Sequence, residues 1–139
     1  MIKIILAGHG TWPSAMKLSA EMITGKGNRI YTLEVNNVDT ADNIFLKLNK
    51  LMKTIDYSIL VILLDLFGGS PMHATVKLFD QKNVLVISGA NLCMLLDLLF
   101  IDEDEFNLYE ISNRIVKIGR ENIVDVFEIL KERMGENKE

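Results

Sequence analysis

The sequence predicts an α/β fold built on a largely parallel sheet, and three observations support this prediction. Short apolar runs alternate with amphipathic segments almost throughout the chain, as strands and helices do in such folds. The run SILVILLD (58–65) is apolar on both faces, which is typical of a central strand covered on both sides. The length of 139 residues suits one domain with a sizeable core. We therefore expect three layers, α/β/α, within a single domain over residues 1–139.

The N-terminal half predicts two strands and two helices. Ile2–Ala7 predicts an apolar strand, and a helix is expected over about 13–23, with a proline in its first turn and the glycines of GKGN at its end. A second strand, RIYTLEV (29–35), follows. Asp39 is then expected to cap a helix over about 40–54. The apolar residues of that helix form a core-facing stripe at helical spacing: Ile44, Leu48, Leu51, Met52 and Ile55.

The alternation continues after the central strand. LFGGSP leads into a helix expected over about 71–79, with Ser70 as its N-cap and Pro71 as its first helical residue. NVLVIS (83–88) predicts a fourth strand, and NLCMLLDLLF (91–100) predicts a short apolar helix.

The C-terminal part is less clear. The acidic run DEDEF (102–106) predicts a solvated loop and the start of a helix over about 106–118 that ends at Gly119. The apolar residues of NIVDVFEIL (122–130) suit either a final strand or a helix. From Lys131 onward we expect a frayed tail.

The composition excludes several classes of protein. The net charge is −4 and the basic residues form no stripe, so nucleic acid is not an expected partner. Cys93 is the only cysteine, which excludes an internal disulfide and fits a reducing cytoplasm; we expect it to be a buried small apolar residue. No segment approaches the ~20 apolar residues that a membrane span needs, so we expect a cytoplasmic protein.

Three polar residues follow three strands of the predicted sheet. His9 comes after the first strand, Asp65 ends the central strand, and Asn91 follows the fourth. The carboxyl ends of parallel strands lie at one edge of the sheet, where open α/β folds bind their ligands. We therefore expect these three residues to share one site.

A carboxylate beside a histidine has a definite chemical use. Asp65 can accept a hydrogen bond from one ring nitrogen of His9, which leaves the other nitrogen free to act as a base, a metal ligand or a nucleophile. In FGGSP, Gly68 and Gly69 allow the backbone to approach a ligand closely, and the helix start with the Ser70 hydroxyl forms an anion site. An oriented histidine facing a phosphate-binding turn indicates phosphoryl transfer through a phosphohistidine.

Each of these features also fits a purely structural role when taken alone. His73 is expected to be an exposed helical residue near the mouth of the site. Trp12 suits a lid, a partner contact or core packing. With two histidines and no cluster of cysteines or carboxylates, no metal site is expected.

At these residues the sequence resembles a known family. GHGTW, DLFGGSPMHA and GANLCML together resemble the enzyme IIA component of the mannose/fructose/sorbose class of the bacterial sugar phosphotransferase system (PTS), over nearly the whole chain. The resemblance implies that His9 carries the phosphoryl group and that Asp65 orients it. It also implies that Gly68, Gly69 and Ser70 contact the phosphate, without any cofactor.

The resemblance further implies partners. They are phosphorylated HPr as donor, enzyme IIB as acceptor, an indirect association with the membrane components IIC and IID, and a homodimer. In that homodimer the C-terminal segment IVDVFEI would be an antiparallel strand exchanged between subunits. Gly10, Trp12, His73 and Asn91 are candidate partner contacts. The chain departs from the family pattern at His73, where asparagine is usual, and at Cys93, where proline is usual.

Three other functions remain open from the residues alone. Ser70, His9 and Asp65 are the residue types of a hydrolase triad, although GGSPM is not a G-x-S-x-G elbow. GHGTWPSA with Glu34 resembles the start of a dinucleotide site but has no third glycine. The third is a regulatory domain that senses phosphorylation without passing it on. The related subunit of dihydroxyacetone kinases would have serine in place of Gly10.

Overall fold

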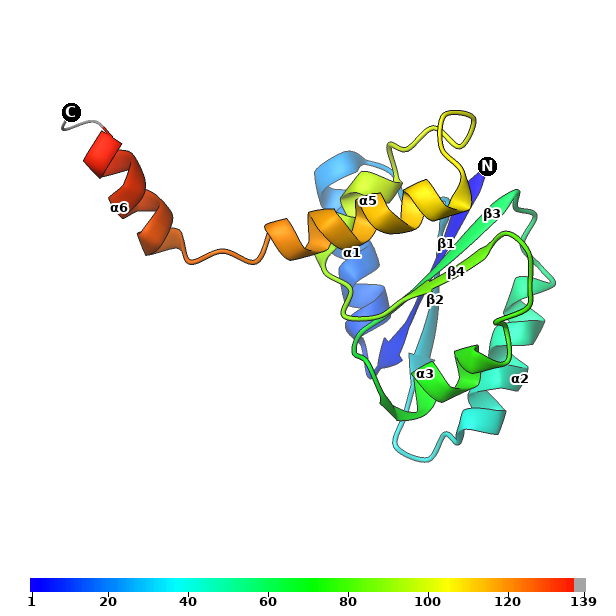
Figure 1. The fold of residues 1–139 in the computed structure, drawn as a ribbon. Coiled ribbons are helices and arrows are strands. Elements are labelled where there is room, and N and C mark those ends of the chain that lie inside the picture. Colours follow the sequence, from blue (N-terminus) through cyan, green and yellow to red (C-terminus); the bar gives the residue numbers. More distant parts are fainter. Residues whose placement is uncertain (137–139) are drawn as a thin grey trace.

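A four-stranded parallel sheet forms the centre of the molecule. The computed structural model describes residues 1–136 and orders the strands β2-β1-β3-β4 (Figure 1). The strands are β1 (Ile2–His9), β2 (Ile30–Val35), β3 (Ile59–Leu64) and β4 (Val84–Ile87), and all three pairings are parallel. The predicted sheet is therefore confirmed.

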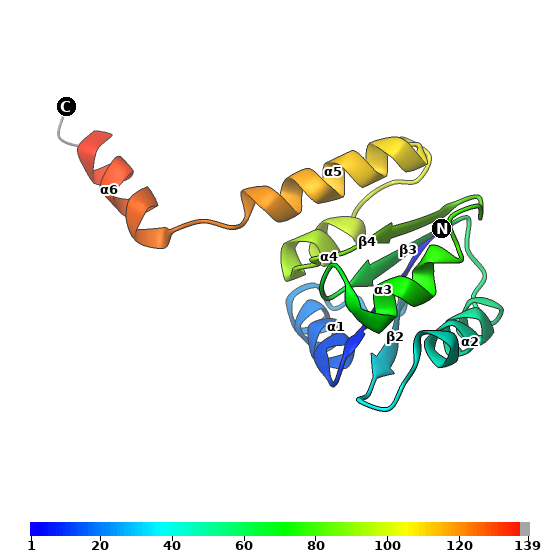
Figure 2. The same cartoon turned by 60° about the horizontal axis from the view of Figure 1, so that its bottom comes forward.

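Helices cover both faces of this sheet. On one face lie α1 (Trp12–Thr24), α4 (Leu92–Leu98) and α5 (Leu108–Glu121), and on the other lie α2 (Ala41–Met52) and α3 (Gly69–Val76) (Figures 1 and 2). This arrangement confirms the predicted three-layer α/β/α class.

The strand pleat divides the core into two clusters. In β1, Ile4 and Leu6 pack under α1 and α4, whereas Ile5 and Ala7 pack under α2 and α3. All four side chains are buried, because β1 is an inner strand with a helical layer on each side.

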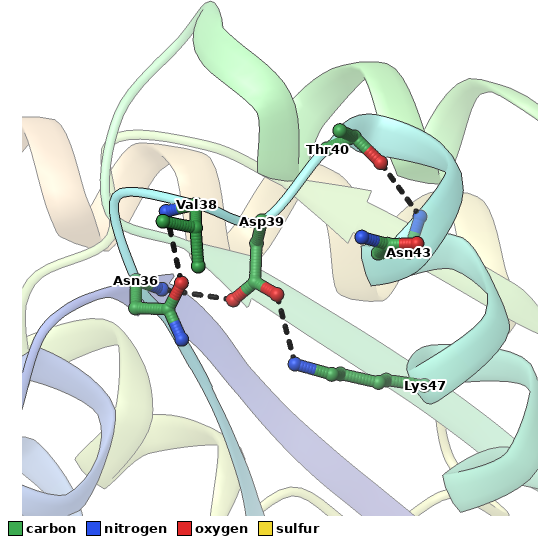
Figure 3. Close-up of polar contacts among 6 residues, drawn as sticks. All are labelled: Asn36, Val38, Asp39, Thr40, Asn43 and Lys47. Atoms are coloured by element: carbon green, nitrogen blue, oxygen red, sulfur yellow. Dashed lines mark hydrogen bonds and ion pairs between the residues drawn. The ribbon is translucent and has the colours of Figure 1, made fainter.

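The cap of α2 differs from the prediction. Thr40, and not Asp39, is the N-cap, and its hydroxyl accepts a hydrogen bond from the Asn43 amide at 3.2 Å. The Asp39 carboxylate instead accepts from the Asn36 amide and from Lys47 Nζ, both at 2.9 Å (Figure 3). The Asn36 hydrogen bond, with the Lys47 ammonium beside it, lowers the pKa of the Asp39 carboxyl.

The start of α3 also differs. The helix begins at Gly69 with Gly68 as its N-cap, and it ends at Val76, so the prediction of Ser70 as N-cap and of a helix over 71–79 is wrong. Gly68 has φ 110° and ψ 179°, a conformation that side chains disfavour, and this places the turn two residues earlier. Pro71 still lies in the first helical turn. Proline is tolerated there because a backbone N–H at that position would have no partner within the helix.

The predicted end of α5 at Gly119 is wrong, because the helix continues to Glu121. A Cβ atom at Gly119 would lie 2.6 Å from Met94 Sδ on α4, so glycine allows the two helices to pack closely. The glycine therefore serves tertiary packing and does not stop the helix.

Residues 126–136 form a helix, α6 (Val126–Glu136), and not the expected exchanged strand or frayed tail. The Asp125 carboxylate accepts hydrogen bonds from the Phe127 and Glu128 amides and thereby starts this helix. α6 has no buried residue and extends away from the sheet (Figures 1 and 2). The rest of the expected tail, 137–139, lies outside the described residues. Within 1–136, no helix combines the length and apolar character required to cross a membrane.

Candidate active site

The parallel register brings His9 and Asp65 together. Ala7 on β1 pairs with Leu64 on β3, so the residues that follow emerge side by side at the carboxyl edge of the sheet. His9 Nδ1 lies 2.8 Å from Asp65 Oδ2, and the His9 backbone amide donates to the same oxygen at 2.9 Å. One carboxylate oxygen therefore fixes both the backbone and the ring of His9.

The two side chains differ in exposure. The Asp65 side chain is 12% exposed and its second oxygen accepts from the Leu66 amide at 3.0 Å, whereas the His9 side chain is 50% exposed. A carboxylate accepts hydrogen bonds, so the contact with Asp65 favours the tautomer whose proton is on Nδ1. The lone pair of Nε2 is then available on the exposed ring.

Gly8 allows this contact, and our sequence reasoning did not identify it. A Cβ atom at Gly8 would lie 2.8 Å from Asp65 Cγ and equally close to Trp12 Cε3, so any side chain would displace one of them. The only signal in the sequence is a glycine at the end of an apolar strand, which marks a close approach as often as a bend.

The glycine turn before α3 lies beside the His9 ring. A Cβ atom at Gly69 would be 3.8 Å from His9 Cε1, the ring carbon between the two nitrogens. Gly69 and Ser70 are the first residues of α3, where amides have no helical partner and the helix dipole is positive. The start of α3 is therefore suited to an anion held next to Nε2.

The remaining candidate residues lie around this centre with varied contacts. Trp12 begins α1 and packs against the core, so core packing accounts for it. Gly10 has φ 59° in the turn into α1, and His73 is exposed on α3. The Asn91 side chain accepts from the Met94 amide and donates to the Gly119 carbonyl, which engages its amide group between α4 and α5.

The residues of the alternative functions are engaged differently. Within residues 1–136, no hydrogen bond joins the Ser70 hydroxyl to His9, as a hydrolase triad would need. The Glu34 carboxylate, considered as a ribose ligand, accepts a hydrogen bond from the Ser14 hydroxyl on α1.

Large apolar side chains are exposed near the site. Leu66 and Phe67, directly after Asp65, are 46% and 81% exposed, and Val38 on the β2–α2 loop is 81% exposed. These loops follow β3 and β2 at the carboxyl edge of the sheet. Exposed apolar residues beside a reactive group are typical of a protein-docking surface.

Comparison with known proteins gives a consistent result. The family model described as PTS system fructose IIA component matches residues 3–116. The fructose-specific EIIA component of the PTS from Bacillus subtilis is 26% identical over 141 residues, covering 99% of this chain and 92% of the relative. The mannose-specific EIIAB component of Escherichia coli K12 is 27% identical over 124 residues, covering 88% of this chain but only 38% of the relative. A crystal structure of phosphotransferase system component EIIA from Streptococcus agalactiae matches with TM-score 0.76 and 26% identity, covering 90% of this chain and 97% of that one.

Proposed function

This chain belongs to the PTS system fructose IIA component family, and on that premise we propose that it accepts a phosphoryl group from phosphorylated HPr on His9 and passes it to enzyme IIB. Its coarser role, that of a phosphoryl-carrier component of a sugar phosphotransferase system, follows from the family itself. The observation that supports the finer proposal is the 2.8 Å contact between His9 Nδ1 and Asp65, which leaves Nε2 on the exposed side of the ring.

The proposed reaction moves one phosphoryl group between two imidazoles. The Nε2 lone pair of His9 attacks phosphorus, and the bond from phosphorus to the donor's ring nitrogen breaks, with its electron pair returning to the donor. His9 then holds the phosphoryl group on Nε2 and a proton on Nδ1. Asp65 stabilises the positive charge that the ring gains during the attack. Transfer to IIB repeats these steps in the opposite direction.

The start of α3 supplies the second part of the mechanism. We propose that the Gly69 and Ser70 amides and the Ser70 hydroxyl donate hydrogen bonds to the equatorial oxygens of the transferring group; the position of Gly69 beside the His9 ring at the helix start supports this. Donors held by the backbone are already oriented before the donor protein arrives, so they stabilise the transition state with little rearrangement.

We infer that HPr and IIB dock on the exposed apolar residues around His9, namely Val38, Leu66 and Phe67. Gly10, in the exposed turn into α1, and His73, exposed on α3, are further candidate contacts. The protein would work as one domain in the cytoplasm, and its association with membrane components IIC and IID would be indirect, through IIB.

We also infer a homodimer in which a second copy covers the C-terminal segment. Four large apolar side chains of α6 are exposed, which favours a protein partner over water. Reciprocal coverage by an identical chain would close the assembly with two-fold symmetry. The exposed side chains concerned are Val126, Phe127, Leu130 and Met134.

The deciding experiment is intact-mass measurement after incubation with phosphoenolpyruvate, enzyme I and HPr. The wild type should gain one acid-labile phosphoryl group and His9→Ala should gain none. His73→Ala, which removes the other histidine but keeps His9, should still gain one. A folded wild type that gains no phosphoryl group would contradict the proposal. Phosphorylation without onward transfer to IIB would instead favour the regulatory role, and labelling of Ser70 by a fluorophosphonate probe would favour the hydrolase.

A further inference from the structure

A side chain within α3 holds the glycine turn. The Gly68 amide donates a hydrogen bond to the thioether sulfur of Met72 at 3.2 Å. Gly68 is the N-cap of the helix and has φ 110° and ψ 179°. Met72 is partly buried and packs against the core under α2 and α3, so the sulfur is held by its own surroundings.

The start of α5 shows why a methionine takes this position. There the backbone N–H of the N-cap Asn107 donates a hydrogen bond to the carboxylate of Glu110, the third helical residue, at 3.2 Å. In α3 the third helical residue is Pro71, which has no side-chain acceptor. The next residue, Met72, supplies the acceptor, so the N-cap amide of α3 is bound by a side chain of its own helix, as it is in α5.

This contact decides which amides face the reacting group. The Gly68 amide is engaged by Met72, so Gly69 and Ser70 remain as donors at the helix start. A thioether is a neutral acceptor. A carboxylate in its place, as in α5, would bring a negative charge to the turn that the phosphoryl oxygens approach.

We propose that Met72 is a positioning residue for phosphoryl transfer: its sulfur holds the Gly68 amide and thereby keeps the start of α3, where Gly69 lies beside the His9 ring, in place. This inference rests on the proposed function, because the turn matters only if His9 receives a phosphoryl group. Without the sulfur, Gly68 is free to leave its unusual conformation, and the start of α3 loses its fixed place beside the ring.

Two substitutions separate the hydrogen bond from side-chain packing. Met72→Leu keeps an apolar side chain of similar volume but removes the acceptor, and Met72→Gln restores a neutral acceptor. Met52→Leu is the matched control, because Met52 lies in the same core cluster at the last residue of α2, away from the turn. Rates of His9 phosphorylation are measured over a range of phospho-HPr concentrations.

We expect Met72→Leu to lower the maximal rate about 3- to 10-fold, as the loss of one neutral hydrogen bond implies, with the half-saturating concentration of phospho-HPr unchanged. Met72→Gln should recover most of the rate, and Met52→Leu should match the wild type. Wild-type rates in Met72→Leu, or a loss in Met52→Leu of equal size, would overturn the inference. Failure of the wild type itself to be phosphorylated would overturn the proposed function instead.

Amide hydrogen exchange provides a readout that needs no partner protein. In the unphosphorylated wild type the Gly68 amide should be protected, and Met72→Leu should expose it while leaving the α3 interior protected. A Gly68 amide that exchanges in the wild type as fast as an unbonded amide would refute the contact. This measurement stands even if Met72→Leu folds poorly.

Discussion

Replacing Gly8 with alanine tests the packing that holds His9 and Asp65 together. The added Cβ atom would lie 2.8 Å from Asp65 Cγ and the same distance from Trp12 Cε3. Ordinary contacts begin near 3.4 Å, so the carboxylate or the indole must move by about 0.6 Å, the difference between 3.4 and 2.8 Å. Trp12 begins α1 and Asp65 directly follows β3, so neither moves freely.

The substitution should therefore affect stability and transfer together. Overpacking of this kind lowers the free energy of unfolding by about 1–3 kcal/mol. If Asp65 moves, its 2.8 Å contact with His9 Nδ1 lengthens toward about 3.4 Å, beyond the usual limit of a hydrogen bond. A ring misplaced by a fraction of an ångström should slow phosphorylation by roughly 10- to 100-fold.

The assays are denaturant unfolding and the rate of acid-labile phosphoryl incorporation at His9. Gly135→Ala is the matched control, because a Cβ atom there meets nothing within 4 Å, and it should leave the transfer rate unchanged. Wild-type stability and rate in Gly8→Ala would refute the packing argument. Lower stability with a wild-type rate would show that the indole yields and that Gly8 has no part in orienting His9.

Three further predictions address other parts of the molecule. Asp65→Asn should slow phosphoryl transfer roughly 100- to 10,000-fold without unfolding the protein, because an amide can present a donor to Nδ1 and move the ring proton to Nε2; the assay is the same incorporation rate. Asp39→Asn should be less stable than the wild type above about pH 4, and the difference should vanish at lower pH. The native pKa of Asp39 lies below its unfolded value, so its contribution is lost as pH falls through the native pKa; unfolding midpoints from pH 2 to 7 measure this. Phe127→Glu should shift the protein from dimer to monomer in analytical ultracentrifugation, and an unchanged dimer would contradict the role of α6 in assembly.

The sequence predicted the sheet and the meeting of His9 with Asp65 for one physical reason. Parallel strands place their carboxyl ends at one edge, so identifying β1 and β3 from their apolar runs is enough to bring the two residues together. Neither side chain has to be located individually.

The helix ends were not predictable in the same way. Asp39 and Thr40 are both residue types that cap helices well. The Asp39 carboxylate pairs with Lys47, eight positions further along the chain, and does not cap α2. Ser70 is likewise a good cap, but the backbone of Gly68 starts the helix earlier. Gly119 would end a helix in isolation, yet the packing of Met94 determines its role.

The C-terminal segment is the clearest case of ambiguity. The apolar residues of 122–130 fit both periodicities, and in the described part of the chain α6 buries no residue that would select one. The Asp125 cap then decides for a helix. Local hydrogen bonding, and not burial of apolar side chains, therefore determines that this segment is a helix.

The single free nitrogen of His9 has a kinetic consequence. Asp65 holds the ring at Nδ1 and the His9 side chain is half exposed, so Nε2 is the nitrogen at which a phosphoryl group would both enter and leave. Under the proposed function, donor and acceptor must therefore occupy the protein in turn and compete for it. Steady-state transfer should follow ping-pong kinetics. Unphosphorylated HPr should inhibit the second step by competing with IIB, and excess IIB should inhibit the first step by competing with phosphorylated HPr. Under this proposal, only one partner at a time can bind at His9.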